Sequence, residues 1–229
     1  MASATAAFFD LDGTLITGHM YSQILKQRMN TPMGAWRAMT YLVSHLAQAP
    51  LDKARLINRT RFFRSWVVDA AGLLKGLEVD KSGSLFTTIA EGLLATIRPD
   101  VQQLLRQHQE QGHAVVLVSG TFLPLLKEIG GRLHISHVVG TPLAERNGRY
   151  TGRLAGPFVF GEEKARQTQL YLQANGLQID LAASYTYADR IHDLPLLQLV
   201  GHPVATYPDV ELLAHARQQG WRVVGEAHA

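Results

Sequence analysis

The sequence predicts an α/β fold: a doubly wound, Rossmann-like parallel sheet with an all-helical domain inserted into it. A short apolar run at residues 4–9 leads into Asp10 and a turn at Gly13, which indicates a buried parallel strand. After residue 97, apolar runs typical of buried strands alternate with stretches of helical periodicity. We therefore expect a core formed by residues 1–16 and 97–229, and a helical cap formed by residues 17–96.

The cap segment is expected to hold four or five helices, because its apolar residues recur at helical spacing and show no alternation of period two. Trp36, Met39, Val43 and Leu46 are part of this pattern. Past the cap, Pro99 suits the first position of a helix that ends before Gly112. Further elements are expected in this order: strand 114–118, helix 122–133 broken at Gly130-Gly131, strand 136–139, a hairpin turn at Asn147-Gly148, helix 162–174, strand 184–188, helix 194–199, strand 203–206, helix 210–219 and strand 221–224.

Composition narrows the class of protein. The chain has no cysteine, which excludes a disulfide framework and cysteine-based metal sites or nucleophiles. Its net charge of +3 fits a protein that handles anions, but no basic arm is present, so we expect no nucleic-acid partner. No apolar run approaches the roughly 20 residues of a membrane span, and the N-terminus lacks the charged region of a signal peptide. We expect a cytoplasmic protein without stable membrane insertion; its oligomeric state is left open.

Groups capable of catalysis follow three of the expected strands, and one more lies near the start of a helix. They are Asp10 and Asp12, Ser119 and Gly120, Asp189 and Asp193, and Lys164 on the helix. Each has an ordinary explanation by itself, as a turn, a helix cap or a solvated lysine. Ligands of doubly wound sheets bind beyond the carboxyl ends of the strands, however. The occurrence of all four groups in one such sheet favours a catalytic site.

The chemistry of this set is that of phosphoryl transfer. A carboxylate such as Asp10 can attack phosphorus and form an acyl phosphate, while a second carboxylate, Asp12, transfers the proton. Mg²⁺ held by Asp10 and Asp189 would reduce the repulsion between the nucleophile and the phosphate. The Ser119 hydroxyl with its neighbouring amide groups and the Lys164 ammonium would bind the phosphoryl oxygens.

These residues resemble the four signature motifs of the haloacid dehalogenase superfamily. Residues 10–15 (DLDGTL) are similar to the first motif, 116–121 (VLVSGT) to the second, Lys164 to the third and 189–195 (DRIHDLP) to the fourth. The position and size of the insertion resemble the phosphoserine-phosphatase-like branch, subclass IB, with a helical C1-type cap. The resemblance implies these roles: Asp10 as nucleophile, Asp12 as general acid and base, Thr14, Ser119, Gly120 and Lys164 as phosphate-binding residues, Asp10, Asp189 and the Asp12 carbonyl as metal ligands, and Asp193 in support of that site.

The second aspartate, Asp12, decides between reaction types, because dehalogenating members of the superfamily lack it. We expect a phosphatase that uses Mg²⁺ and hydrolyses a small-molecule phosphate ester through a phosphoaspartate. One alternative is a phosphomutase or phosphotransferase that uses the same aspartate. Another is a non-catalytic phosphate-binding protein of the same fold.

Three positions bear on the substrate. His19 stands where phosphoserine phosphatases carry a glutamate for the substrate's ammonium group, which disfavours phosphoserine; it either contacts substrate or caps a helix. Arg190 replaces the usual glycine or serine and either contacts substrate or points to solvent. Arg59, in a basic stretch of the cap, either binds a substrate anion or belongs to a solvated face. A small polar metabolite is the favoured substrate, with an amino-alcohol phosphate such as histidinol phosphate as one example, and a lipid phosphate stays open. Residues 156–161 have the glycine spacing of a Walker loop but lack its lysine, so no nucleotide-binding loop is expected.

Overall fold

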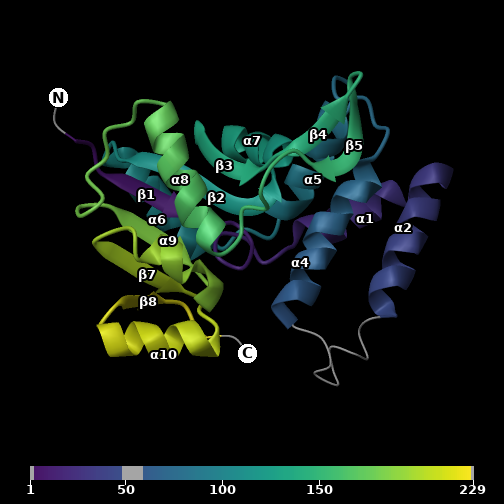
Figure 1. Cartoon of the computed structure of the whole chain (residues 1–229). Helices are drawn as coiled ribbons and strands as arrows, with labels where there is room; N and C mark the ends of the chain where they lie inside the picture. Colours follow the sequence, from purple (N-terminus) through teal and green to yellow (C-terminus); the bar gives the residue numbers. More distant parts are fainter. Residues whose placement is uncertain (1–2, 48–58, 228–229) are drawn as a thin grey trace.

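A six-stranded parallel sheet forms the centre of the computed structural model, which describes residues 3–47 and 59–227 (Figure 1). The strand order is β3-β2-β1-β6-β7-β8, and every neighbouring pair is parallel. The strands are β1 (Ala6–Phe9), β2 (Ala114–Phe122), β3 (His137–Thr141), β6 (Tyr185–Ala188), β7 (His202–Thr206) and β8 (Arg222–Val224). The expected α/β class is confirmed.

The central strand β1 is apolar throughout because helices cover both of its faces. Ala7 and Phe9 belong to the apolar cluster on the side of α6 (Pro99–Glu110) and α7 (Leu123–Arg132). Ala6 and Phe8 point the other way, into the cluster under α8 (Glu162–Ala174) and α9 (Leu194–Leu197). A further helix, α10 (Val210–Gln219), packs on β7 and β8. Since β2, β1 and β6 are neighbours, their carboxyl ends meet at one edge of the sheet.

The helical segment lies between β1 and α6 and stands beside the sheet in Figure 1. Its described elements are α1 (Met20–Arg28), α2 (Pro32–Leu46), α4 (Arg59–Asp69), the 3₁₀ helix η1 (Ala70–Leu74) and α5 (Gly83–Leu94). The chain leaves and re-enters the core at adjacent points, because the amide of Thr17 donates to the carbonyl of Thr96 at 3.1 Å. One apolar cluster nevertheless joins helices of this segment to α7, so the division into core and cap remains a proposal.

The predicted hairpin turn joins β4 (Leu143–Arg146) to β5 (Arg149–Leu154), which pair antiparallel. Asn147 and Gly148 have φ angles of 52° and 67°, as a two-residue turn of type I′ requires. The hairpin reaches the helical segment, because Tyr150 exchanges backbone hydrogen bonds with Gly76 and Leu77 at 2.8 and 3.0 Å. This contact ties the end of η1 to the core.

Several expected boundaries are wrong: β3 ends two residues later and α9 two residues earlier than expected. Two further differences affect β2 and α7. Strand β2 does not end at Val118 but continues to Phe122, which pairs with Thr141 after a shift in register. The Ser119 motif therefore lies within an irregular part of the strand rather than after it. Helix α7 is not broken at Gly130-Gly131 and continues to Arg132. A Cβ atom at Gly130 would lie 2.9 Å from the Ile135 carbonyl oxygen, so this glycine permits a close approach of backbone instead of ending the helix.

Candidate active site

A pocket opens at the carboxyl edge of the sheet, and nearly all of the predicted site residues line it. Its inner part is formed by Asp10, Asp12, Ser119, Gly120, Thr121, Lys164, Asp189 and Asp193. Its outer part is formed by His19, Met20, Tyr21, Val67, Phe158, Phe160, Arg190 and His192. Of the predicted residues, Thr14 is buried beneath the pocket. The side chain of Arg59 lies outside the part of the chain that the structure describes.

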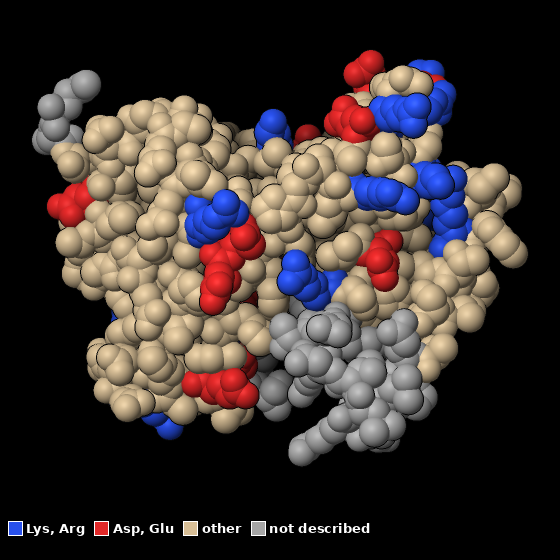
Figure 2. All heavy atoms as spheres, in the orientation of Figure 1, with Lys and Arg blue, Asp and Glu red and all other residues tan. Residues whose placement is uncertain are grey.

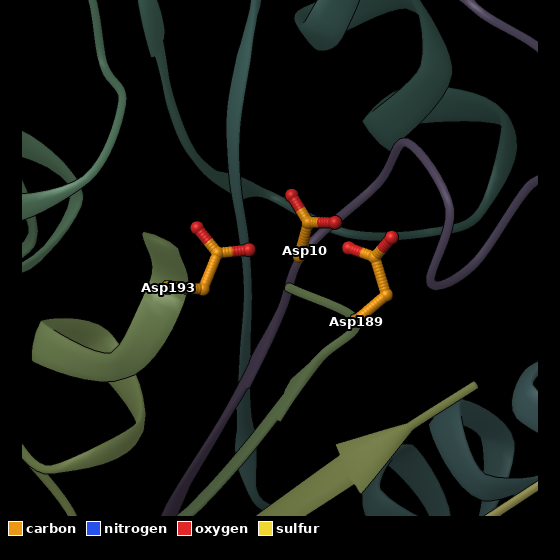
Figure 3. A group of neighbouring side chains, drawn as sticks. All are labelled: Asp10, Asp189 and Asp193. Carbon is orange, nitrogen blue, oxygen red and sulfur yellow. The ribbon is translucent and has the colours of Figure 1, made fainter. Parts of the chain in front are cut away.

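Lys164 joins two buried carboxylates at the centre of the site. Its Nζ atom lies 2.6 Å from Oδ1 of Asp10 and 2.8 Å from Oδ1 of Asp193. The three side chains come from the end of β1, the first turn of α8 and the turn before α9, and all are buried. Asp189, at the end of β6, completes the group; Figure 3 shows the three aspartates pointing toward one another. Three carboxylates thus face one ammonium group.

This excess of negative charge alters the titration of the group. Burial raises the pKa of Asp10 to about 6, an effect that Lys164 opposes and Asp193 reinforces. Burial also raises the pKa of Asp189, with further contributions from Asp10 and Asp193. For Lys164, burial acts to lower the pKa, but the attraction of Asp10 and Asp193 outweighs it and the pKa is raised. Lys164 therefore stays charged, while the aspartates lack a full complement of positive charge.

The donor set fits a hard divalent cation. Asp10, Asp189 and Asp193 each offer a carboxylate oxygen, and these oxygens lie within 4.8 Å of one another. Asp10 and Asp189 follow the neighbouring strands β1 and β6, and this pair would bind an ion that prefers oxygen ligands. The turn after β1 fits closely against this pair: Gly13 has φ +91°, and a Cβ atom there would lie 2.1 Å from Oδ2 of Asp189. Only glycine leaves space for the Asp189 carboxylate.

Hydroxyl groups fix the orientation of both aspartates of the first motif. Thr121 donates to Oδ2 of Asp12 at 3.0 Å, and Ser119 lies 3.4 Å from the same oxygen. The backbone amide of Thr121 donates to the Ser119 hydroxyl at 3.0 Å. Thr14 donates to Oδ2 of Asp10 at 3.0 Å from below. In this structure Thr14 therefore holds the Asp10 carboxylate rather than facing the pocket.

The two residues singled out for substrate choice lie on the outer wall. His19 occupies the N-cap position of α1, but its side chain makes no capping hydrogen bond. Its Nδ1 lies 3.9 Å from Oδ1 of Asp12, and its ring stacks on Tyr21 with a centroid distance of 5.5 Å. Arg190 places Nε 3.4 Å from Oδ2 of Asp189, with 41% of its side chain exposed. Both side chains are thus held beside the aspartates at the mouth of the pocket.

An aromatic wall was missed by the sequence analysis, which considered residues 156–161 only as a failed Walker loop. Phe158 and Phe160 stack with a centroid distance of 5.5 Å and line the pocket. A Cβ atom at Gly120 would lie 2.8 Å from the Phe158 ring. The ring can pack against the second motif because residue 120 has no side chain. The role of Thr121 beside Asp12 was also missed. The sequence signal for the aromatic wall was the pair Phe158 and Phe160, which stand just before the helix of Lys164.

Comparisons with known proteins agree with this geometry. The family model for haloacid dehalogenase-like hydrolases matches residues 7–198. The chain is similar to the phosphoserine phosphatase SerB1 of Mycobacterium tuberculosis, with 28% identity over 219 residues that cover 95% of this chain and 70% of that protein. It is also similar to a histidinol-phosphatase of Neisseria meningitidis, with 33% identity over 138 residues that cover 59% of this chain and 62% of that protein.

Solved structures show the same fold. A protein of unknown function from Bordetella pertussis has a TM-score of 0.81 at 23% identity, covering 98% of this chain and 99% of its own. A phosphoserine phosphatase with a phospho-aspartyl intermediate analogue has a TM-score of 0.64 at 18% identity, covering 99% and 95%. The assignment to subclass IB stays a prediction. The matched family model, together with the aspartates and lysine gathered at the sheet edge, places this chain in the haloacid dehalogenase-like hydrolase family.

Proposed function

We propose that the protein is a Mg²⁺-dependent phosphatase that hydrolyses a small-molecule phosphomonoester through a phosphoaspartate at Asp10. The observation that carries the proposal is the pairing of two unlike carboxylates in one pocket. Asp10 is buried and bound by Lys164, whereas Asp12 is partly exposed and held by hydroxyl groups. A nucleophile fixed in place beside a solvent-accessible proton carrier is the arrangement that a two-step displacement needs. Relatives named as phosphatases support this choice.

In the first step, a carboxylate oxygen of Asp10 attacks the phosphorus atom. The new O–P bond forms as the ester P–O bond breaks, and the carboxyl group of Asp12 gives its proton to the leaving oxygen. Lys164 holds Asp10 in position and contributes positive charge beside the phosphoryl oxygens. The Ser119 hydroxyl and the backbone around Gly120 line the same end of the pocket and would donate to those oxygens.

In the second step, the Asp12 carboxylate accepts a proton from a water molecule, whose oxygen attacks phosphorus. The acyl O–P bond breaks, inorganic phosphate leaves, and Asp10 is regenerated while Asp12 again carries a proton. Asp10, Asp189 and the backbone carbonyl of Asp12 would hold the Mg²⁺ ion, with Asp193 fixing Lys164. When bound, the ion supplies positive charge that offsets the charge of the phosphate and of the carboxylates.

The helical segment would act as the cap of this site. The N-cap residue His19 and the α1 residues Met20 and Tyr21 line the pocket wall, and α4 contributes Val67. These side chains lie over the inner aspartates, so the segment is placed to limit the access of water to the phosphoaspartate. Apart from the four aspartates, the described residues of the pocket wall include no carboxylate. A leaving group bearing an ammonium would lack an ion-pair partner, which supports a substrate other than phosphoserine and also disfavours the amino-alcohol phosphate expected from the sequence.

The test is phosphate release from a panel of phosphomonoesters, with and without Mg²⁺. Wild type should show metal-dependent turnover, and Asp10→Asn should reduce kcat on the order of 10⁴-fold or more, because the nucleophile is lost. Asp80→Asn, at an exposed turn before α5, is the matched control and should retain wild-type activity. Turnover that survives in Asp10→Asn would overturn the mechanism. Formation of an isomerised phosphate ester without inorganic phosphate would instead identify a mutase.

A further inference from the structure

Helix α2 presents an apolar face to solvent. Nine large hydrophobic residues are exposed in the described part of the chain, and six of them lie between residues 29 and 46. They are Met29, Met33, Trp36, Met39, Val43 and Leu46, each more than half exposed. The five on α2 recur at intervals of three or four residues and therefore form one stripe along the helix. We name these six residues the α2 stripe.

The opposite face of α2 is the more polar one. The residues that α2 buries are Gly34, Ala38, Tyr41 and His45. Tyr41 donates to the Trp66 carbonyl at 2.7 Å, and Nε2 of His45 lies 3.3 Å from Oδ2 of Asp69. A surface helix ordinarily turns its apolar stripe to the core and its polar residues to water. This reversed distribution indicates that something other than the core covers the α2 stripe.

The surroundings of the stripe are basic. Helices α1 and α2 together have three basic residues, Lys26, Arg28 and Arg37, and no acidic residue. Among the described residues, Lys26 is exposed on α1 and Arg37 lies at the edge of the stripe, with its guanidinium bonded to the carbonyl of Lys75. The outer edge of the molecule, where Figure 1 draws α2, is largely uncharged in Figure 2, with basic side chains at its border.

We propose that the α2 stripe docks on the surface of an anionic phospholipid bilayer. A helix with exposed Trp, Met and Leu side chains and a basic border lies in the interface of such a bilayer, with its apolar side chains among the upper acyl chains. No helix in residues 3–47 and 59–227 is long and apolar enough to span a membrane, so the contact is peripheral. Trp36, at 68% exposure, is the residue placed to enter the interface.

Charge favours the bilayer over a second copy of the chain. An isologous dimer through α2 would bring two copies of this helix pair together, each with a net charge of +3 from the residues counted above. That repulsion opposes pairing of the two stripes, whereas an anionic headgroup layer attracts each of them. The stripe is separate from the catalytic pocket, and its members are absent from the pocket wall as described. Docking does not depend on the proposed phosphatase activity.

Sedimentation of the full chain with vesicles tests the proposal. Wild type should sediment with vesicles of phosphatidylcholine and phosphatidylglycerol, not with phosphatidylcholine alone, and added salt should weaken the binding. The double variant Trp36→Ser/Val43→Ser should reduce the partition coefficient on the order of tenfold or more, since two of the deepest apolar groups are lost. The control Val210→Ser removes an equally exposed apolar residue on α10 and should bind as wild type does.

Circular dichroism and thermal unfolding would establish that each variant is folded; the substituted side chains are exposed, so all three proteins should unfold alike. Absence of wild-type binding to anionic vesicles, or equal binding by the double variant, would overturn the proposal. Sedimentation velocity gives the other decisive outcome. A wild-type dimer that Trp36→Ser/Val43→Ser converts to monomer, without vesicle binding, would assign the stripe to a second copy and also overturn it.

Discussion

The sheet edge and the helical segment both bury polar side chains, but the two regions differ in the partners that these side chains have. At the sheet edge, Lys164 contacts Asp10 and Asp193, Asp189 lies beside Arg190, and all of these side chains open onto the pocket. In the helical segment, polar groups of α2 are matched with groups of α4, as in the contact between His45 and the Asp69 carboxylate. The first cluster has a net negative charge; in the second, Tyr41 and His45 of α2 contact Trp66 and Asp69 of α4.

The two regions indicate two kinds of interaction in one fold, one through buried charge and one through exposed apolar surface. Burial of unbalanced charge is costly, and it is retained where a ligand supplies the missing charge. The sheet edge therefore implies a bound cation or an interaction with a substrate. In the helical segment, the buried partners hold α2 in an orientation that leaves its apolar face outside. There the unbalanced feature is exposed apolar surface, which implies a partner rather than an ion.

The largest effect should come from removing Lys164, the buried cation of the sheet edge. Lys164→Met leaves Asp10 and Asp193 facing each other, and loss of one partner from a buried ion pair costs about 3–5 kcal/mol. Urea unfolding without divalent cations should therefore show a stability loss of that size. Mg²⁺ stabilises the folded chain because the ion binds only the folded aspartate cluster. Added Mg²⁺ should stabilise this variant more than wild type, because the variant lacks the ammonium group that offsets the carboxylates.

Lys127→Met is the matched control for this substitution. Lys127 is exposed on α7, and a surface change of this kind alters stability by about 0.5 kcal/mol or less. Equal losses in the two variants would show that the charge balance at the sheet edge contributes nothing to stability. A response to Mg²⁺ that is the same in wild type and in Lys164→Met would remove the support for a cation at the aspartates.

Gly13→Ala should have an intermediate effect, centred on Asp189. The new methyl group meets the Asp189 carboxylate and is forced into a positive φ, so we expect about 2 kcal/mol of destabilisation and a rise in the Mg²⁺ concentration needed for half-maximal activity. Gly112→Ala provides the comparison, since Gly112 also has positive φ but has no atom within 4 Å of an added Cβ. A Mg²⁺ requirement raised equally in both would mean that backbone strain alone is responsible.

Much of the sheet edge was predictable, because parallel strands place their carboxyl ends together whatever lies between them. Lys164 and Asp10 are 154 positions apart, yet strand order alone brings them to one edge. The helix of Lys164 was predicted with the observed bounds, Glu162–Ala174, from its periodicity. The direction of individual side chains was not predictable. Thr14 faces down to Asp10 and Phe158 turns into the pocket, which depends on contacts made only in the folded chain.

The helical segment was less predictable for a related reason. Periodicity indicates that Trp36 and Val43 share a helix face, but it does not say which face is buried. The rule that apolar faces turn inward would have put the α2 stripe in the core. Tyr41 and His45 reverse that choice, because their polar atoms contact Trp66 and Asp69 of α4 and the small residues Gly34 and Ala38 allow close packing. Such pairing depends on tertiary contacts that the sequence pattern does not contain.

The smallest effect concerns the interior of the sheet domain, away from the aspartates. His108 is buried, with Nε2 2.8 Å from the Tyr187 hydroxyl and Nδ1 2.8 Å from Nδ1 of His113. Burial lowers the pKa of His108 from 6.5 to about 4, and the charges of His113 and Arg222 add to this. The unfolded chain therefore binds one more proton than the folded chain between these values. Unfolding free energy should be unaffected by this group above pH 6.5 and should fall as the pH drops toward 4, by about 1–3 kcal/mol.

His108→Gln should flatten that part of the stability profile, since glutamine keeps hydrogen-bonding capacity without titrating. Urea unfolding between pH 7 and pH 4 would measure the slope in wild type and variant. His202→Gln, at an exposed histidine at the start of β7, should leave the slope unchanged. A wild-type profile that remains steep in His108→Gln would place the acid sensitivity elsewhere. Asp10 would not be that source, because its raised pKa makes the folded chain gain stability as the pH falls.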